Sequence, residues 1–273
     1  MKSFLRKNWF GLLSVMLSFA ILISLVSSHG IKKFFDVIKK VEPGFLLFAF
    51  VLIILYCLLD GCVLYFLTRI KYKSYSFSSA LKTSFIGIFY SAITPMSVGG
   101  QPIQILDMTR KKVKFCDASS FVIIKMIVFQ IALVLYSIFG LFFYKKFNVK
   151  NFWFFAIAGL ILNIGFILVS ILMSIKKDFI TKVCVRLLNF FAKIKFFKSK
   201  DLDETKQRMT EQIKLFSDSA KFIGRQKKSL FILLFISFVE LTVYYLIPYY
   251  ILKSFGVNTD LVLTVFATSL IYM

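Results

Sequence analysis

The chain has 273 residues, of which 59% are hydrophobic and 18% charged, and its formal net charge is +22. Soluble domains are usually near half apolar and a quarter charged, so this composition excludes an ordinary soluble protein and indicates an integral membrane protein. The positive charge does not indicate a nucleic-acid partner, because excess Lys and Arg in membrane proteins mark cytoplasmic loops. The four cysteines have no zinc-type spacing and His29 is the only histidine, so we expect no metal and no cofactor.

Six apolar stretches predict membrane helices, because about 20 apolar residues cross the hydrocarbon core. In chain order they are 9–28, 44–67, 118–143, 152–175, 230–252 and a sixth from 259 to Met273. The first is long for a signal sequence and lacks an A-x-A cleavage site, so we expect it to be retained. The stretch 77–93 is only moderately apolar and predicts a helical arm.

The segment 176–229 contains 15 Lys or Arg against 6 Asp or Glu. Apolar residues recur at helical spacing from Phe179 to Phe197, which predicts a basic amphipathic helix on the membrane surface. Asp201 and Glu204 form a capping-box pattern that predicts the start of a second helix, folded back on the first. The positive-inside rule places this helical hairpin in the cytoplasm.

Two topologies give similar charge asymmetry. In the first, the N-terminus is inside and residues 77–105 enter and leave the membrane on the same side. In the second, residues 77–94 span the membrane and the N-terminus is outside. We prefer the first, because Lys2, Arg6 and Lys7 adjoin the first helix.

The segment "TPMSVGGQPIQ", residues 94–104, is polar and rich in helix breakers. Pro95 and Pro102 lack an amide donor, and Gly99 and Gly100 allow unusual backbone and close approach of a ligand. The segment therefore predicts irregular backbone between two helical arms, 77–93 and 103–109. At membrane depth such backbone survives only inside protein or beside a wet cavity, where it can bind substrate; a surface turn between helices is the alternative.

The run "ITPMSVGGQPIQILDMTRKK", followed by "KMIVFQIALVLYSI", resembles the lysylphosphatidylglycerol synthase transmembrane region. This flippase-like family includes the membrane part of the multiple peptide resistance factors. The resemblance implies a helix bundle around a cavity that handles phospholipid head groups. By motif match, the residues it implies are Thr94, Pro95, Gly99, Gly100, Gln101 and Pro102. Family members usually continue to a second Pro/Gly-rich segment, so the chain is expected to be truncated at its C-terminal end.

Four ionisable residues fall inside apolar stretches, where charge is costly and is often functional. They are Asp60, Lys82, Lys125 and Glu240. One hypothesis has Lys82, Lys125 and Arg110 bind a lipid phosphate, assisted by the N–H groups of Gly99 and Gly100 and by Gln101 and Gln104. Asp60 and Glu240 would then bind the amine of a lysyl head group. The alternative is a set of structural ion pairs between these lysines and carboxylates.

The sequence thus predicts an all-α polytopic membrane protein with a broken or re-entrant Pro/Gly segment and a cytosolic amphipathic hairpin. We expect one domain, 1–273, comprising a bundle (1–175), the hairpin (176–229) and C-terminal membrane helices (230–273). The expected function is a lipid flippase-like protein of the bacterial inner membrane, handling head groups such as lysylphosphatidylglycerol. The expected partners are anionic or aminoacylated phospholipids and no nucleic acid; a homo-oligomer is left open.

Two other functions compete with transport. One is phosphatidylglycerol lysyltransferase activity, or the membrane portion of such an enzyme, which the family resemblance links to resistance against cationic antimicrobial peptides. The sequence offers no catalytic constellation for it, neither a G-x-S-x-G motif nor a phosphate-binding glycine loop. The other is a membrane scaffold that docks through 176–229 and would not need the segment 94–104.

Overall fold

A computed structural model of the chain describes residues 41–94, 97–142, 152–176 and 202–272, together with a few isolated positions. Within these ranges the protein is all-α and contains no strand, which confirms the predicted fold class. The long helices are α3 (Pro43–Arg69), α4 (Phe77–Ile93), α5 (Gly100–Arg110), α6 (Phe115–Phe142), α7 (Phe152–Ile175), α9 (Leu202–Gly224), α10 (Lys227–Ser254) and α11 (Leu261–Ile271). The predicted helices 9–28 and 179–197 lie outside the described residues.

Three of the described helices, α3, α6 and α10, are long and apolar enough to cross a membrane. The helices agree closely with the apolar stretches of the sequence, and α7 has the predicted bounds. The apolar part of α7, Ala156–Leu172, and helix α11 are shorter than these three candidate spans. The chain is therefore a helical membrane protein.

Helix starts follow from local sequence. Pro43 begins α3, where its missing N–H costs no hydrogen bond. Ser76 caps α4 by accepting a hydrogen bond from the Ser79 N–H at 3.2 Å, and Asp260 caps α11 through the Leu263 N–H at 2.8 Å. These caps satisfy amides that lack a partner within the first turn.

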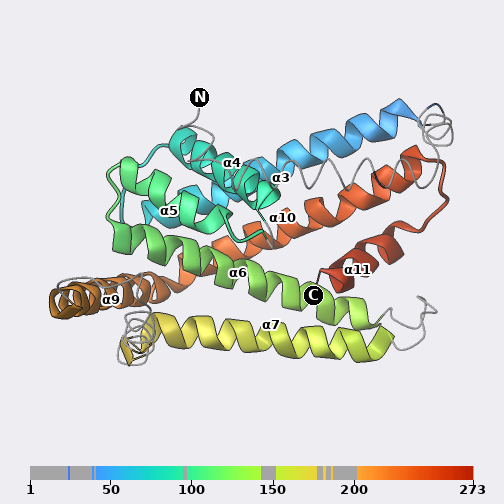
Figure 1. The fold of residues 1–273 in the computed structure, drawn as a ribbon. Helices are drawn as coiled ribbons and strands as arrows, with labels where there is room; N and C mark the ends of the chain where they lie inside the picture. Colours follow the sequence, from blue (N-terminus) through green and yellow to red (C-terminus); the bar gives the residue numbers. More distant parts are fainter. Residues whose placement is uncertain are drawn as a thin grey trace.

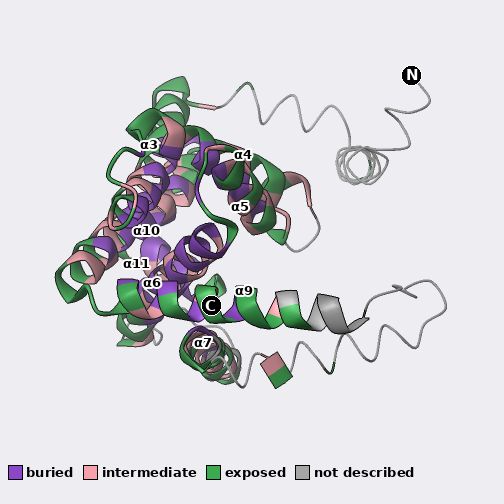
Figure 2. Ribbon diagram, turned by 90° about the vertical axis from the view of Figure 1, so that its left-hand side faces the viewer, coloured by how far each residue is buried: buried purple, intermediate pink, exposed green. Residues whose placement is uncertain are grey.

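The helices pack around α3, α6 and α10 (Figure 1). Helix α10 runs antiparallel to α3, since the Glu42 N–H at the start of α3 donates to the Ser254 carbonyl at the end of α10, 2.8 Å away. Helix α7 packs on α6 and α9 at the edge of the bundle, where most of its surface is intermediate or exposed (Figure 2). Exposed Ile161, Leu162 and Leu168 fit a lipid-facing surface.

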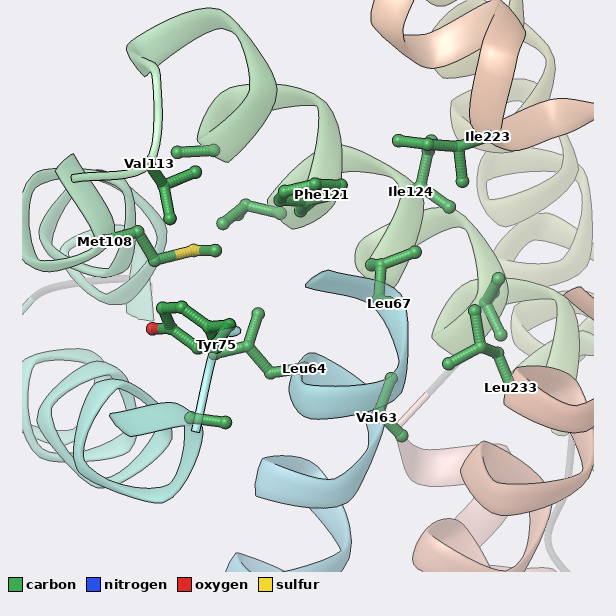
Figure 3. Packing of buried hydrophobic residues seen from close by; sticks show 14 of the residues in the cluster. Val63, Leu64, Leu67, Tyr75, Met108, Val113, Phe121, Ile124, Ile223 and Leu233 are labelled. Carbon is green, nitrogen blue, oxygen red and sulfur yellow. The ribbon is translucent and has the colours of Figure 1, made fainter. Parts of the chain in front are cut away.

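The largest buried cluster joins the ends of several helices (Figure 3). Leu64 and Leu67 of α3 meet Met108 of α5, Phe121 of α6 and Ile223 of α9, and each of the five is fully buried. The cluster fixes α5 and α9 to the membrane helices α3 and α6. It therefore holds the polar segment after α4 against the bundle.

Helix α9 confirms the second amphipathic helix that the sequence predicts. Its Ile213, Ala220 and Ile223 are buried. The Ser120 hydroxyl of α6 donates to the Phe216 carbonyl at 3.1 Å, and the Ser217 hydroxyl donates to the Ser174 carbonyl of α7 at 3.1 Å. The apolar face of α9 therefore packs on α6 and α7; the partner predicted for it, 179–197, lies outside the described residues.

Basic residues gather at one end of the bundle, among them Arg69, Lys71, Arg110, Lys111 and Lys114, and we call it the basic end. The Lys71 ammonium after α3 lies 2.5 Å from the Asp117 carboxylate at the start of α6. The second topology of the sequence analysis is therefore wrong, because it puts these two positions on opposite sides of the membrane. The first topology, in which 77–105 returns to its own side, agrees with this contact.

Candidate functional site

Helices α4 and α5 form an antiparallel hairpin whose register is fixed by polar contacts. At its open end, the Lys111 ammonium donates to the Ser79 carbonyl and the Thr83 hydroxyl, both at 2.9 Å, and lies 2.5 Å from the Asp107 carboxylate. The Thr83 hydroxyl also donates to the Asp107 carboxylate at 2.6 Å. These contacts hold the start of α4 beside the end of α5, at the basic end.

Two glycines let the helices of the hairpin touch. A Cβ atom on Gly100 would lie 2.6 Å from the Gly87 carbonyl oxygen and would also overlap the Ser91 hydroxyl. A Cβ atom on Gly87 would overlap the side chain of Gln104. Real Cβ atoms do not come this close, so both positions require glycine. One glycine of the sequence motif is therefore used for helix packing.

The tip of the hairpin is a short turn. Its Thr94 hydroxyl accepts from the Gly99 N–H at 2.9 Å and donates to the Tyr90 carbonyl at 2.6 Å. Ser97 adopts a left-handed backbone with φ 56°. Pro95 and Met96 lie outside the described residues.

The predicted irregular segment 94–104 is shorter than expected, because α5 begins at Gly100. Pro102 is the third residue of α5, and the first amides of a helix have no intrahelical acceptor, so proline breaks nothing there. The Gly99 N–H is already bonded to Thr94. In this arrangement it is not free to bind a lipid phosphate, which corrects that part of the sequence hypothesis.

Neither helix of the hairpin is long enough to cross a bilayer. At 1.5 Å per residue, the 17 residues of α4 extend about 25 Å and the 11 residues of α5 about 16 Å, against roughly 30 Å of hydrocarbon. Because both arms end at the basic end, the segment has the geometry of a re-entrant hairpin. Such backbone requires protein or a polar cavity around it.

A polar cavity of about 320 Å³ lies beside this hairpin, bounded by five helices. Helix α3 contributes Tyr56 and Asp60, and α10 contributes Ser237 and Glu240. The remaining polar lining comes from α4, α5 and α6: Ser91, Gln101, Gln104, Lys125 and Gln130. The first turn of α5 opens into this cavity, since Gly100 and Gln101 both line it.

Three ionisable side chains meet in the cavity. The Lys125 ammonium lies 2.6 Å from one oxygen of Asp60, and the other oxygen of Asp60 accepts a hydrogen bond from Ser84. Glu240 is 1% exposed, interacts electrostatically with Asp60 and Lys125, and has one carboxyl oxygen without a hydrogen-bond partner. The site thus holds two carboxyl groups and one ammonium, and one further cation or one proton would balance its charge.

The charged set lies far from both ends of the membrane helices. Asp60 is nine residues from the end of α3, about 14 Å along the axis, and Lys125 is ten residues from the start of α6, about 15 Å. Glu240 is near the middle of α10. In a hydrocarbon core of about 30 Å, these groups lie close to mid-depth, where ionisable residues mark substrate or ion pathways.

The cavity brings together half of the candidate residues from the sequence. Gly100, Gln101, Gln104, Lys125 and Glu240 line it. Four of the others do not form part of the lining, namely Thr94, Gly99, Pro102 and Arg110, and Pro95 lies outside the described residues. Arg110 and Lys82 are exposed, so the structure does not join them to Lys125 in one phosphate site.

Sequence reasoning missed the serines and the tyrosine of the site. Ser84, Gly87 and Ser91 recur at intervals of three and four residues, which places them on one face of α4. That spacing was a readable signal for a polar helix face. Tyr56 gives no such signal, because a tyrosine in an apolar run also fits an ordinary helix core.

The fold and the cavity define a class of protein: a helical integral membrane protein with a charged cavity at mid-depth and a re-entrant hairpin beside it. The chain matches the model of the lysylphosphatidylglycerol synthase TM region over residues 11–273, and it belongs to that family. Comparison with curated proteins and with solved structures gives no match.

Proposed function

We propose that this protein is a flippase-like carrier that moves the head group of a phospholipid through the cavity between α3, α5, α6 and α10. The observation that carries the proposal is Glu240, a fully buried carboxyl group with an unsatisfied oxygen in a polar cavity at mid-depth. Leaving a buried carboxyl oxygen without a hydrogen bond costs free energy, which supports a ligand that donates to this oxygen and completes the site.

The charge of the site favours a lipid with an amine, such as lysylphosphatidylglycerol. Asp60 and Glu240 together exceed the positive charge of Lys125 by one unit when all three are ionised. A primary ammonium group supplies the missing charge and up to three hydrogen-bond donors. The family to which the chain belongs supports the same class of lipid.

The phosphate of that lipid would be held by the start of α5. The Gly100 and Gln101 amides belong to the first turn, where N–H groups have no intrahelical acceptor and the helix dipole favours an anion. The side-chain amide of Gln101 is a further donor in the lining. The amine and the phosphate would thus bind opposite walls of one cavity.

The orientation of the carrier follows from its charge. Arg69, Lys71, Arg110, Lys111 and Lys114 lie at the basic end, and the positive-inside rule assigns that end to the cytoplasm. In a bacterium this membrane would be the inner membrane. The hairpin would then enter the membrane from the cytoplasmic side, and its tip would reach the cavity at mid-depth.

The test is transport of acyl-labelled lysylphosphatidylglycerol in proteoliposomes, read by chemical bleaching of the outer leaflet. Glu240→Gln keeps the side-chain volume and removes the charge. We expect the rate to fall about tenfold or more, because hydrogen bonds to charged groups contribute about 1.5–3 kcal/mol. Glu42→Gln, at the exposed start of α3, is the matched control and should transport normally. Equal rates for Glu240→Gln and the control would refute the proposal.

A second candidate function is support of lysyl transfer to phosphatidylglycerol, which the family name favours. It is tested by incubating the purified chain with lysyl-tRNA and phosphatidylglycerol. We expect no product from this chain alone. Lysylphosphatidylglycerol formation that requires Glu240 would favour the enzyme instead.

A further inference from the structure

An apolar groove lies on the outside of the bundle, between α6, α7, the end of α9 and the start of α10. Its volume is about 710 Å³. The walls are mainly aliphatic and aromatic, among them Ile127, Ile131, Ile171, Leu230, Phe231 and Leu234. Phe231 is 73% exposed, so the groove is open to the surroundings of the membrane helices.

The groove is separate from the charged cavity. Ile124 and Val128 of α6 line the groove, whereas Lys125 and Phe129 of the same helix line the cavity. Each residue turns the helix by about 100°, so neighbours such as Ile124 and Lys125 point about 100° apart, and the groove and the cavity lie against different faces of α6. A ligand in the groove therefore does not occupy the transport site, and the inference goes beyond the proposed function.

Three cations stand at the basic end of the groove. They are Lys221 and Arg225, one turn apart around the end of α9, and Lys227 at the start of α10. The Arg225 N–H donates to the Lys221 carbonyl at 3.1 Å, which keeps these two residues on the same side. The turn between α9 and α10 thus gathers three positive charges over one apolar opening.

The three cations lack acidic partners within the described part of the chain. None of them takes part in a salt bridge there, and the groove lining contains no carboxylate. The nearby Asp218 lines a different hollow with Lys71 and Lys114. A site that is apolar along its length and purely basic at its rim is complementary to an amphiphile with an anionic head.

We infer that this groove binds one anionic phospholipid, with an acyl chain along α6 and α10 and its phosphate against Lys221, Arg225 and Lys227. Two of its walls belong to the membrane helices α6 and α10, so lipid hydrocarbon lies beside the groove and can fill it. Lys and Arg near a membrane surface attract anionic lipid about fivefold each, so three of them favour it by roughly a hundredfold over a neutral lipid.

Native mass spectrometry of the detergent-purified full chain tests this site. Phosphatidylglycerol and phosphatidylcholine with identical acyl chains are added in turn, and retained lipid is counted. The charge variant is Lys221→Gln/Arg225→Gln/Lys227→Gln. Its matched control, Lys73→Gln/Lys214→Gln/Lys228→Gln, removes three exposed charges that do not line the groove.

We expect the wild type and the control to retain phosphatidylglycerol at least about tenfold better than phosphatidylcholine, and the charge variant to lose this preference. A second variant, Gly224→Phe, fills the groove, since a Cβ atom there meets nothing within 4 Å. It should reduce retention of both lipids.

Three results would overturn the inference. The first is an equal loss of preference in the control and charge variants. The second is binding of glycerol phosphate, which has no chain, as strong as that of phosphatidylglycerol. The third is a wild-type dimer that becomes monomeric in Gly224→Phe, since a second copy would then fill the groove. Transport by Glu240 variants is a separate measurement, so failure of either proposal leaves the other intact.

Discussion

The Lys125 ammonium of α6 lies 2.6 Å from the Asp60 carboxylate of α3, with both side chains largely buried. This contact joins two membrane helices and forms part of the lining of the charged cavity. It therefore has a structural effect that can be measured apart from transport.

Lys125→Met should destabilise the protein by about 3–5 kcal/mol, because it leaves Asp60 as an uncompensated buried charge. Asp60→Asn/Lys125→Met should regain much of this loss, since position 60 then no longer carries an unpaired charge. Thermal unfolding in detergent measures both. A double variant whose loss of stability equals the sum of the losses in Lys125→Met and Asp60→Asn alone would show that the pair is not coupled.

Gly100→Ala should separate the tip of α5 from α4, because the new methyl group would lie 2.6 Å from the Gly87 carbonyl oxygen. Backbone cannot give way as a side chain can, so we expect a lower Tm and a loss of transport together. Gly165→Ala in α7 is the control, since a Cβ atom there meets nothing within 4 Å. Alanine at that helical position should be neutral or stabilising by up to about 1 kcal/mol.

Lys111→Met should loosen the open end of the hairpin. It removes two hydrogen bonds of 2.9 Å and the ion pair with Asp107, which together should cost about 1–3 kcal/mol. Lys112→Met, one residue later, is the control, because Lys112 is exposed and makes no such contact. Hydrogen exchange of the α5 amides checks the effect; exchange that rises equally in both variants would contradict it.

Tyr72, in the loop after α3, should stabilise the folded protein by an amount that decreases at alkaline pH. Burial, followed by the hydrogen bond that its hydroxyl donates to Asp117 at 2.6 Å, raises the pKa of Tyr72 from 10.0 to about 12. A raised pKa means that the folded state favours the protonated phenol. The contribution, about 1 kcal/mol, is thus complete below pH 10 and is lost as the pH rises to 12.

The difference in unfolding free energy between wild type and Tyr72→Phe should accordingly shrink between pH 10 and pH 12. Groups common to both proteins, such as the lysines, cancel in this difference. Tyr90→Phe, at an exposed position in α4, is the control for removing a tyrosine hydroxyl elsewhere in the protein. A constant difference for Tyr72→Phe across this range would disprove the assignment.

The membrane helices could be predicted from the sequence because long apolar runs have few alternatives in a bilayer. The ends of α5 could not, since Pro102 reads as a helix breaker unless the helix start is already known. The pairing of Asp60 with Lys125, among several permitted pairs, depends on how α3 and α6 pack. Contacts such as that of Gly87 with Gln104 arise between helices, and the periodicity of one helix does not say which residue of another helix packs against it.

The placement of the Asp60–Lys125 pair in different helices bears on how the protein is made. Each of these charges raises the cost of inserting its own helix by about 2.5–3.5 kcal/mol, and the partner of Asp60 is synthesised about 65 residues later. At a synthesis rate of about 5–20 residues per second this delay lasts several seconds. We therefore expect α3 to be stabilised in the membrane only once α6 has been made and Lys125 can pair with Asp60.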